Sequence, residues 1–304
     1  MASEDTIEPT RVMLWCVPRT ISTVLTKCMS FVKSSQIVVE PFNSAYHFGP
    51  EKIQSPAALA ARWEAFDKLQ QQRLQNVKIE GLAHVFEDDQ CTYAWVKGQL
   101  EAEYRGKSLI FCKDHAYGLQ GKYEMIPKGY KHTFLIRHPY KVFISWRKLL
   151  YAHPIFPQFG LCNAPECMFP SKYGFMEQFE LYQYIKANVD PSPIILDADD
   201  LLSNPKSVVE QYCSGVGIPF SDSLLEWPSS IDVIKKWKAA RSLLHINMLQ
   251  QTGGFLDAAL HSSRFNPPKE MPSVTELPED VIPCVEASMP CYQQMYEMRL
   301  KPEV

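Results

Sequence analysis

The sequence predicts an α/β domain of three layers, in which a central, mostly parallel sheet is flanked by helices. Short β-branched or apolar runs alternate with longer stretches of helical spacing, which is typical of βαβ units and not of a β-sandwich. A length of 304 residues suits either two domains or one large unit. No internal repeat and no sharp change of composition divides the chain. The prediction is therefore a single domain over residues 1–304.

The predicted strands and helices follow from the spacing of apolar residues. In the stretch that begins with Pro139, a residue suited to the first turn of a helix, Val142, Phe143 and Trp146 recur on one face. This pattern predicts a helix with one buried side. Strands are predicted at residues 12–16, 36–39, 108–112, 133–136 and 194–196. Helices are predicted at residues 23–32, 56–75, 139–151 and 277–300.

The stretch at residues 151–175 differs from the rest of the chain. It is rich in aromatic residues and prolines and has no regular spacing. A segment of this length without periodicity is often functional, and its aromatic content favours a lid or a wall of an acceptor pocket. A packed surface loop without a ligand is the alternative.

The overall composition is that of an ordinary globular protein. Hydrophobic residues make up 46% and charged residues 21% of the chain, which excludes a disordered or low-complexity protein. No apolar run reaches the roughly 18 residues of a transmembrane helix. Glu4, Asp5 and Glu8 stand where a secretory signal would be basic and then apolar. We therefore expect a cytoplasmic protein that does not enter a membrane.

The nine cysteines indicate reduced thiols and no metal site. Their number is odd, they are scattered, and Cys16 and Cys112 lie inside apolar runs, as expected of small packed hydrophobic residues. The two close pairs, at residues 162 and 167 and at 284 and 291, lack the spacing of a zinc finger and have no histidines nearby. The sequence therefore predicts no bound metal.

Charge is distributed unevenly along the chain. The formal net charge of −3 gives no indication of a nucleic acid or a membrane surface as partner. Between Arg105 and Leu150, however, ten lysines and arginines face only Asp114 and Glu124. The local field of this basic segment suits a small ligand that carries several negative charges.

Reactive residue types follow four of the predicted strands. Arg19 comes after the first strand, Glu40 after the second, the pair Lys113 and His115 after the third, and Arg137 after the fourth. The carboxyl ends of parallel strands lie along one edge of a sheet, and ligands bind in the crevice there. The sequence therefore predicts one site that combines cations with a carboxylate and an imidazole.

The first of these loops contains groups that can bind an anion. It joins a strand to a helix, so backbone N–H groups at the start of the helix and the hydroxyls of Thr20, Ser22 and Thr23 can surround an anion. It is not a Walker loop, because the pattern G-x-x-x-x-G-K-[ST] is absent. A plain helix cap is the other interpretation of these hydroxyls.

Taken together, these motifs resemble the cytosolic sulfotransferase superfamily, whose donor is 3′-phosphoadenosine 5′-phosphosulfate (PAPS). Residues 18–23 are similar to the family's 5′-phosphosulfate loop, P-[KR]-[ST]-G-[ST]-T, and residues 196–205 to its Y-E-D-L-x-x-x-P segment. Arg137 and Ser145, eight residues apart, resemble the pair that holds the donor's 3′-phosphate. The likeness runs from about residue 11 to 220 and is greatest to a divergent sulfotransferase-like branch.

The resemblance implies a P-loop-like, nucleotide-binding fold and a metal-free reaction. The donor would be PAPS, the product 3′,5′-adenosine bisphosphate (PAP), and the acceptor a hydroxyl of a small organic molecule. Donor contacts would come from residues 19–23 (Arg19, Thr20, Ile21, Ser22 and Thr23) and from Arg137 and Ser145. Near the C-terminus, Thr252 and Gly253 are further candidates for closing over the nucleotide.

The sequence departs from the family pattern at three positions. Ile21 replaces the usual glycine, which we expect to exclude a positive φ angle there. Val24 stands where many relatives have a tryptophan that stacks on adenine, and Ala198 stands where they have a tyrosine. The adenine contacts made by those two positions in the family are therefore not expected here.

Sulfuryl transfer needs cations for the growing charge and a base for the acceptor hydroxyl. Arg19 and Lys113 would stabilise the charge on the donor. Two residues compete as the base: His115 resembles the histidine of the small-molecule sulfotransferases, and Glu40 the glutamate of the tyrosylprotein and some bacterial enzymes. An ion pair of Glu40 and a packing role of His115 are the structural alternatives.

Two other functions fit the same residues less well. One is a P-loop-like kinase that uses ATP, against which the missing Walker lysine argues. The other is a non-catalytic nucleotide-binding module. His47, Asp114 and His138 lie beside the motifs and are expected to support the site and not to react. The acceptor and the oligomeric state are not determined by the sequence.

Overall fold

The computed structural model describes residues 8–54, 85–151, 160–248, 256–271, 273, 275 and 277–303. One sheet of seven strands lies at its centre, in the order β3-β7-β2-β4-β1-β5-β6, and every neighbouring pair is parallel. The predicted α/β architecture with a parallel sheet is confirmed. The strands are β1 Thr10–Cys16, β2 Ser35–Val39, β3 Val85–Phe86, β4 Leu109–His115, β5 Lys131–Ile136, β6 Ile194–Asp197 and β7 Trp237–Ala240.

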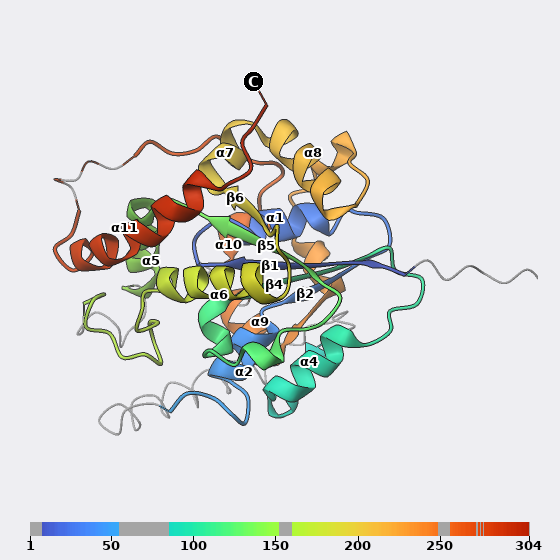
Figure 1. The fold of residues 1–304 in the computed structure, drawn as a ribbon, viewed down its shortest axis with the longest axis horizontal. Helices are drawn as coiled ribbons and strands as arrows, with labels where there is room; N and C mark the ends of the chain where they lie inside the picture. The colour runs from blue at the N-terminus through green and yellow to red at the C-terminus, as the bar shows by residue number, and fades with distance from the viewer. Residues whose placement is uncertain are drawn as a thin grey trace, which may run out of the picture.

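Helices surround this sheet, with α7 and α8 above it and α2 and α4 below it in the view of Figure 1. The α-helices are α1 Ser22–Met29, α2 Pro41–His47, α4 Tyr93–Glu101, α5 Pro139–Leu150, α6 Phe175–Asn188, α7 Ala198–Ser203, α8 Pro205–Val216, α9 Arg241–Met248, α10 Asp257–Leu260 and α11 Ile282–Glu297. The described residues also contain 3₁₀ turns at Asp88–Gln90, Ala116–Leu119, Tyr123–Met125, Asp222–Leu224 and Ile231–Lys236.

The five predicted strands all form, with one consequential difference in length. The third predicted strand ends at residue 112, whereas β4 continues to His115. The carboxyl group of Asp114 accepts the backbone N–H groups of Phe42 and Asn43, and the backbone N–H of Glu40 donates to the carbonyl of Lys113. These tertiary contacts keep three polar residues in the strand. The short strands β3 and β7 were not predicted.

Three of the four predicted helices form, with shifted ends. The helices predicted at 23–32 and 139–151 are α1 and α5. The helix predicted at 277–300 is shorter, because residues 278–281 form a turn and α11 begins at Ile282. The helix predicted at 56–75 lies outside the described residues.

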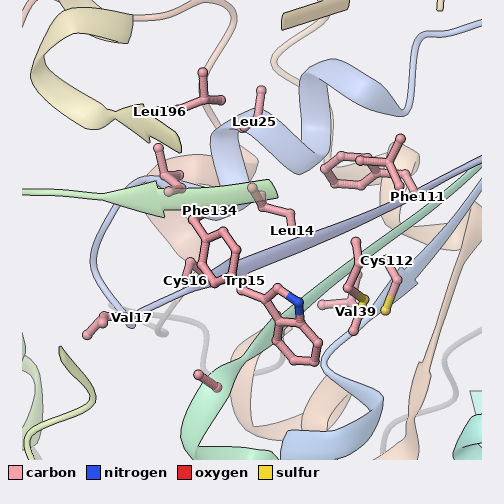
Figure 2. Packing of buried hydrophobic residues seen from close by; sticks show 14 of the residues in the cluster. Leu14, Trp15, Cys16, Val17, Leu25, Val39, Phe111, Cys112, Phe134 and Leu196 are labelled. Atoms are coloured by element: carbon pink, nitrogen blue, oxygen red, sulfur yellow. The ribbon is translucent and has the colours of Figure 1, made fainter. Parts of the chain in front are cut away.

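The core is built on β1, β4 and β5. Successive residues of a strand point to opposite faces of the sheet. In Figure 2, Leu14 of β1 lies toward Leu25 of α1, whereas its neighbour Trp15 lies on the other side of the strand. Trp15 is fully buried, and its indole N–H donates to Nδ1 of His132 at 3.1 Å.

The register of the sheet brings the predicted site residues to one edge. Cys16 pairs with His115 of β4 and Leu135 of β5, and Val39 of β2 pairs with Lys113. The loops after β1, β2 and β5 therefore leave the sheet at one level. Arg19, Glu40 and Arg137, in those loops, lie at the same edge of the sheet as the end of β4.

Candidate functional site

The loop between β1 and α1 has a strained backbone. Arg19 and Ile21 have φ angles of 72° and 61°, in the left-handed region. The expectation that isoleucine would exclude a positive φ at position 21 is therefore wrong. A β-branched residue in this region is a genuine outlier that costs on the order of 1–3 kcal/mol. The packing of partly buried Ile21 against the core helps to offset this cost.

The three hydroxyls of this loop do not share one role. Thr20 is fully buried, and its hydroxyl donates to the carbonyl of Val17 at 2.7 Å, which closes the turn. Ser22 and Thr23 line a cavity at the start of α1. The first N–H groups of a helix have no acceptor within the helix, so this end of α1 presents donors together with the two hydroxyls.

Two arginines and a serine gather beside this loop. Arg19 donates from Nε to Oγ of Ser145 at 3.1 Å, and Arg137 donates from a terminal nitrogen to the carbonyl of Arg19 at 2.9 Å. Residues from the loops after β1 and β5 and from α5 therefore converge. Burial lowers the pKa of both guanidinium groups, and the charge of Arg137 lowers that of Arg19 further. Both effects favour binding of an anion at this point.

One donor of Arg137 is unsatisfied. Its Nε is buried without a hydrogen-bond acceptor among the described residues, and the nearest carboxyl oxygen, Oδ1 of Asp199, is 3.9 Å away. The other oxygen of Asp199 accepts from Lys141 at 2.8 Å. A buried donor without a partner is costly. An oxyanion between the two arginines would remove that cost.

At the ends of β2 and β4, Glu40, Lys113 and His115 form a buried cluster. Lys113 and His115 lie two residues apart on one face of β4, and both contact the same oxygen of Glu40. The contact from Nε2 of His115 is 3.3 Å long. The other oxygen of Glu40 accepts from Nδ2 of Asn43 at 2.9 Å. The exposed fractions of the three clustered residues are 6%, 2% and 3%, so water screens their charges little.

The positions of the protons in this cluster follow from its contacts. Burial would raise the pKa of Glu40, but the charges and hydrogen bonds of Lys113 and His115 outweigh it and hold that pKa well below its ordinary value. Burial and Lys113 lower the pKa of His115, whereas Glu40 and Cys16 raise it, to about 10. At neutral pH both ring nitrogens then carry protons. Nδ1 donates to the carbonyl of Cys16 at 2.9 Å, and Nε2 faces Glu40.

Asp114 supports the cluster from the opposite face of β4. Its carboxyl group accepts the backbone N–H groups of Phe42 at 2.6 Å, Asn43 at 3.1 Å and His115 at 2.8 Å. It thereby holds the start of α2, where Glu40 has a φ angle of 50°. Burial raises the pKa of Asp114 to about 7. These contacts fit the supporting role expected of this residue.

His47 and His138 occupy different places. His47 lines the cavity, and burial lowers its pKa to about 4, so its ring is neutral at pH 7. His138 caps α5, because Nδ1 accepts the backbone N–H of Tyr140 at 3.3 Å. Only His47 is therefore placed to touch a ligand.

A cavity of about 520 Å³ joins the arginine pair to the buried cluster. Among the described residues, five lysines and arginines line it, and Glu40 is the one acidic lining residue. A cavity with this balance of charge favours a ligand that carries several negative charges. The cationic lining consists of Arg19, Lys113, Arg137, Arg264 and Lys269.

The wall beside the cluster is neutral and largely apolar. It includes Tyr117, whose ring stacks on His115 with centroids 5.4 Å apart. Cys167 and Met168, from the described part of the 151–175 segment, also line the cavity. Phe48, Trp146 and Leu150 are further apolar residues of the cavity lining. Sequence reasoning missed Asn43, Tyr117 and Arg264. Asn43 and Tyr117 lie within three residues of Glu40 and His115, whereas no motif stands near Arg264.

The remaining sequence predictions fall on other parts of the cavity or outside it. Thr252 and Gly253 lie outside the described residues. Val24 lines the cavity, whereas Ala198 is fully buried and is not part of the lining. Within the described ranges, no group of three or more metal-ligating residue types could hold a metal ion. In the same ranges, no helix has the length and apolarity needed to cross a membrane.

No family model matches the chain. Its curated relatives include two proteins of Arabidopsis thaliana named branched-chain-amino-acid aminotransferase-like. The match to protein 1 is 24% identical over 221 residues and covers 72% of this chain and 32% of that protein. The match to protein 2 is 29% identical over 126 residues and covers 40% of this chain and 19% of that protein. The chain thus spans about a third or less of the length of these relatives.

Among solved structures, the chain is similar to sulfotransferase domains. For the domain of the Synechococcus PCC 7002 olefin synthase, the TM-score is 0.44 at 15% identity, with 94% of this chain and 96% of that chain covered. For the domain of the curacin biosynthetic pathway, the TM-score is 0.44 at 14% identity, with 98% of this chain and 100% of that chain covered.

Proposed function

We propose that the chain is a sulfotransferase that moves the sulfuryl group of PAPS to a hydroxyl of a small organic acceptor. The observation that carries this proposal is the two-ended cavity. One end holds Arg19 and Arg137, which lie just before α1 and α5, and Ser145 within α5, with a buried arginine nitrogen that lacks an acceptor among the described residues. The other end holds the cluster of Glu40, Lys113 and His115.

In this proposal the cationic end holds the phosphate groups of the donor. Arg137 and Ser145 would bind the 3′-phosphate, and the N–H groups at the start of α1 with Ser22 and Thr23 would bind the 5′-phosphate. The orphaned Nε of Arg137 fits such an oxyanion. The lining around Val24 and Leu202 is aliphatic, so an adenine ring would pack there on side chains and not on a tryptophan.

Glu40 is proposed as the base. At neutral pH His115 already carries its proton, whereas a carboxylate has lone pairs left to accept one from the acceptor hydroxyl. The acceptor oxygen would form a bond to sulfur while the bond from sulfur to the bridging phosphate oxygen breaks. The hydroxyl proton passes to Glu40, and PAP leaves. A loose transition state places little positive charge on the attacking oxygen, so a weak base is sufficient.

The two cations of the cluster have a separate task. Lys113 and protonated His115 lie on the same side of Glu40 and bring positive charge to the place where the donor's bridging oxygen becomes negative. Arg19 would add to this from the phosphate loop. The charge is fixed before the reaction, so little reorganisation is needed.

Transfer of label from [³⁵S]PAPS to a panel of alcohols, phenols and amines tests the function. Sulfated product and a rise in melting temperature with PAP are expected. No product from any acceptor and no melting shift would refute the proposal. A larger shift from ATP with magnesium would favour a kinase, and tight PAP binding without turnover would favour a non-catalytic binding module.

A further inference from the structure

Lys27, in the last turn of α1, is a lysine without contact to water. Its exposed fraction is 0%, and no carboxylate within the described residues forms an ion pair with it. Its ammonium group instead donates to two backbone carbonyls, those of Leu260 and of Ser262, the second at 2.8 Å. Burial of an ammonium group is expensive unless hydrogen bonds compensate it. The cost of burying this ammonium group indicates a functional role for Lys27.

The two carbonyls belong to a segment that forms one wall of the cavity. Residues 260–269, called here the wall segment, supply Ser262, Arg264 and Lys269 to the cavity lining. The segment follows the short helix α10, and its only pairing to another strand-like residue in the described structure is the bridge between Arg264 and Glu226. Besides this bridge, the backbone N–H of Trp227 donates to the carbonyl of Ser263 at 2.8 Å, and side-chain contacts to the backbone of the segment add to this pairing.

Other contacts hold the same segment. The indole nitrogen of Trp227 donates to the carbonyl of Ser262 at 2.9 Å, so this oxygen receives both Trp227 and Lys27. Phe265 packs edge-on against Trp227, with ring centroids 5.1 Å apart. Phe265 is buried, whereas its neighbour Arg264 is exposed at the cavity. Fixing the buried residues thus fixes where Arg264 lies.

A second lysine holds the far end of the wall segment. Lys141, in α5, donates to the backbone carbonyl of Lys269 at 2.6 Å and to Asp199 at 2.8 Å. The segment is therefore attached at its start to α1 and at its end to α5. These are the helix that follows the loop between β1 and α1 and the helix that begins two residues after Arg137.

We propose that Lys27 is a positioning residue that holds the wall segment, and with it Arg264, against the anion-binding end of the cavity. The ammonium group connects α1, whose start would bind the anion, to the wall segment, which carries Arg264 and Lys269. Its effect on a ligand therefore passes through Arg264 and not through direct contact, since Lys27 does not line the cavity. The nature of the anion, a nucleotide with a 3′-phosphate, rests on the proposed function.

The test compares Lys27→Met with Lys33→Met, which removes the same charge from an exposed site just after the same helix. Hydrogen exchange of peptides from residues 256–269 reports on the segment without any ligand. In Lys27→Met these amides should exchange at least about 10-fold faster, while β1 and β4 keep their protection. The Kd for PAP and the KM for the donor should rise about 10-fold with kcat unchanged at saturating donor. Lys33→Met should change none of these values.

Arg264→Gln completes a double-mutant cycle. If Lys27 acts by placing Arg264, the substitution at position 264 should weaken PAP binding in the wild type and have little further effect in Lys27→Met. Additive effects of the two substitutions would overturn the proposal. So would unchanged exchange in the wall segment, or faster exchange spread evenly over the whole protein.

A second variant and a second ligand cover the cases in which Lys27→Met does not fold or PAP does not bind. If Lys27→Met does not fold, Lys27→Gln, which keeps a neutral N–H donor, takes its place with the same expected direction in exchange and Kd. If the wild type binds no PAP, the proposed function fails, but inorganic pyrophosphate binding and hydrogen exchange still measure the role of Lys27. A wild type that binds pyrophosphate no more tightly than Lys27→Met would overturn the positioning role itself.

Discussion

Replacing Glu40 with glutamine tests the proton assignment in the buried cluster most directly. Glu40 lies against both Lys113 and His115, whose nitrogens are 3.4 Å apart. The carboxylate attracts the protonated ring across 3.3 Å by about 5 kcal/mol at an effective dielectric constant of about 20, and Glu40→Gln removes this attraction. This energy is equivalent to more than about three pKa units. The repulsion from Lys113 remains, and His115 can relieve it by losing its proton.

The expected result is a large fall in the pKa of His115. In the wild type that pKa is raised to about 10, so the ring stays protonated through pH 8. In Glu40→Gln we expect it to fall below about 7. NMR titration of the eight histidines measures this, and the signal missing from His115→Gln identifies the residue. Glu103→Gln, which removes an exposed carboxylate paired with Arg105, is the matched control and should leave His115 unchanged.

The same variant tests the proposed base. Loss of a general base lowers kcat by about 10²- to 10⁴-fold, so Glu40→Gln should lose that much sulfuryl transfer. The PAP affinity should change much less, because Glu40 is outside the arginine pair. Titration of wild-type His115 near its ordinary pKa of 6.5 would refute the electrostatic reasoning. Full activity of Glu40→Gln together with a 100-fold loss in His115→Ala would assign the base to His115.

Three further outcomes follow from the structure. Arg137→Gln should raise the Kd for PAP about 10- to 100-fold by calorimetry, and Lys148→Gln, at an exposed position of α5, should not; equal effects would contradict a specific anion contact. His132 is buried, and burial lowers its pKa to about 4. Between pH 6.5 and 4 the unfolded chain therefore binds more protons at this residue than the folded chain does. The free energy of unfolding should fall as the pH drops through that window. Urea midpoints at pH 7.5 and 5.0 measure this fall, which His132→Phe should reduce. Exposed Ser34 has a φ angle of 58°, which glycine adopts more easily than serine. Ser34→Gly should therefore raise the free energy of unfolding by about 1 kcal/mol in the same assay. A loss of stability would contradict the strain argument.

Much of the fold could be predicted because its signals are local. A strand such as β1 is a short apolar run, and a helix such as α5 repeats its buried residues every three or four positions. Strands β3 and β7 were missed because they contain two and four residues and depend on pairing with each other and with β2. No local pattern distinguishes segments of this kind from a loop.

Residue types and spacing alone were enough to predict one common site for Arg19, Glu40, Lys113, His115 and Arg137, because the carboxyl ends of parallel strands share one edge. The tertiary structure decided how these residues work together. It placed Glu40 between two cations, which sets where the protons lie, and it forced Ile21 into a left-handed conformation. Both outcomes depend on burial and on contacts between residues far apart in the chain. Distances across folded segments, unlike the spacing of residues along one segment, exist only once the chain has packed.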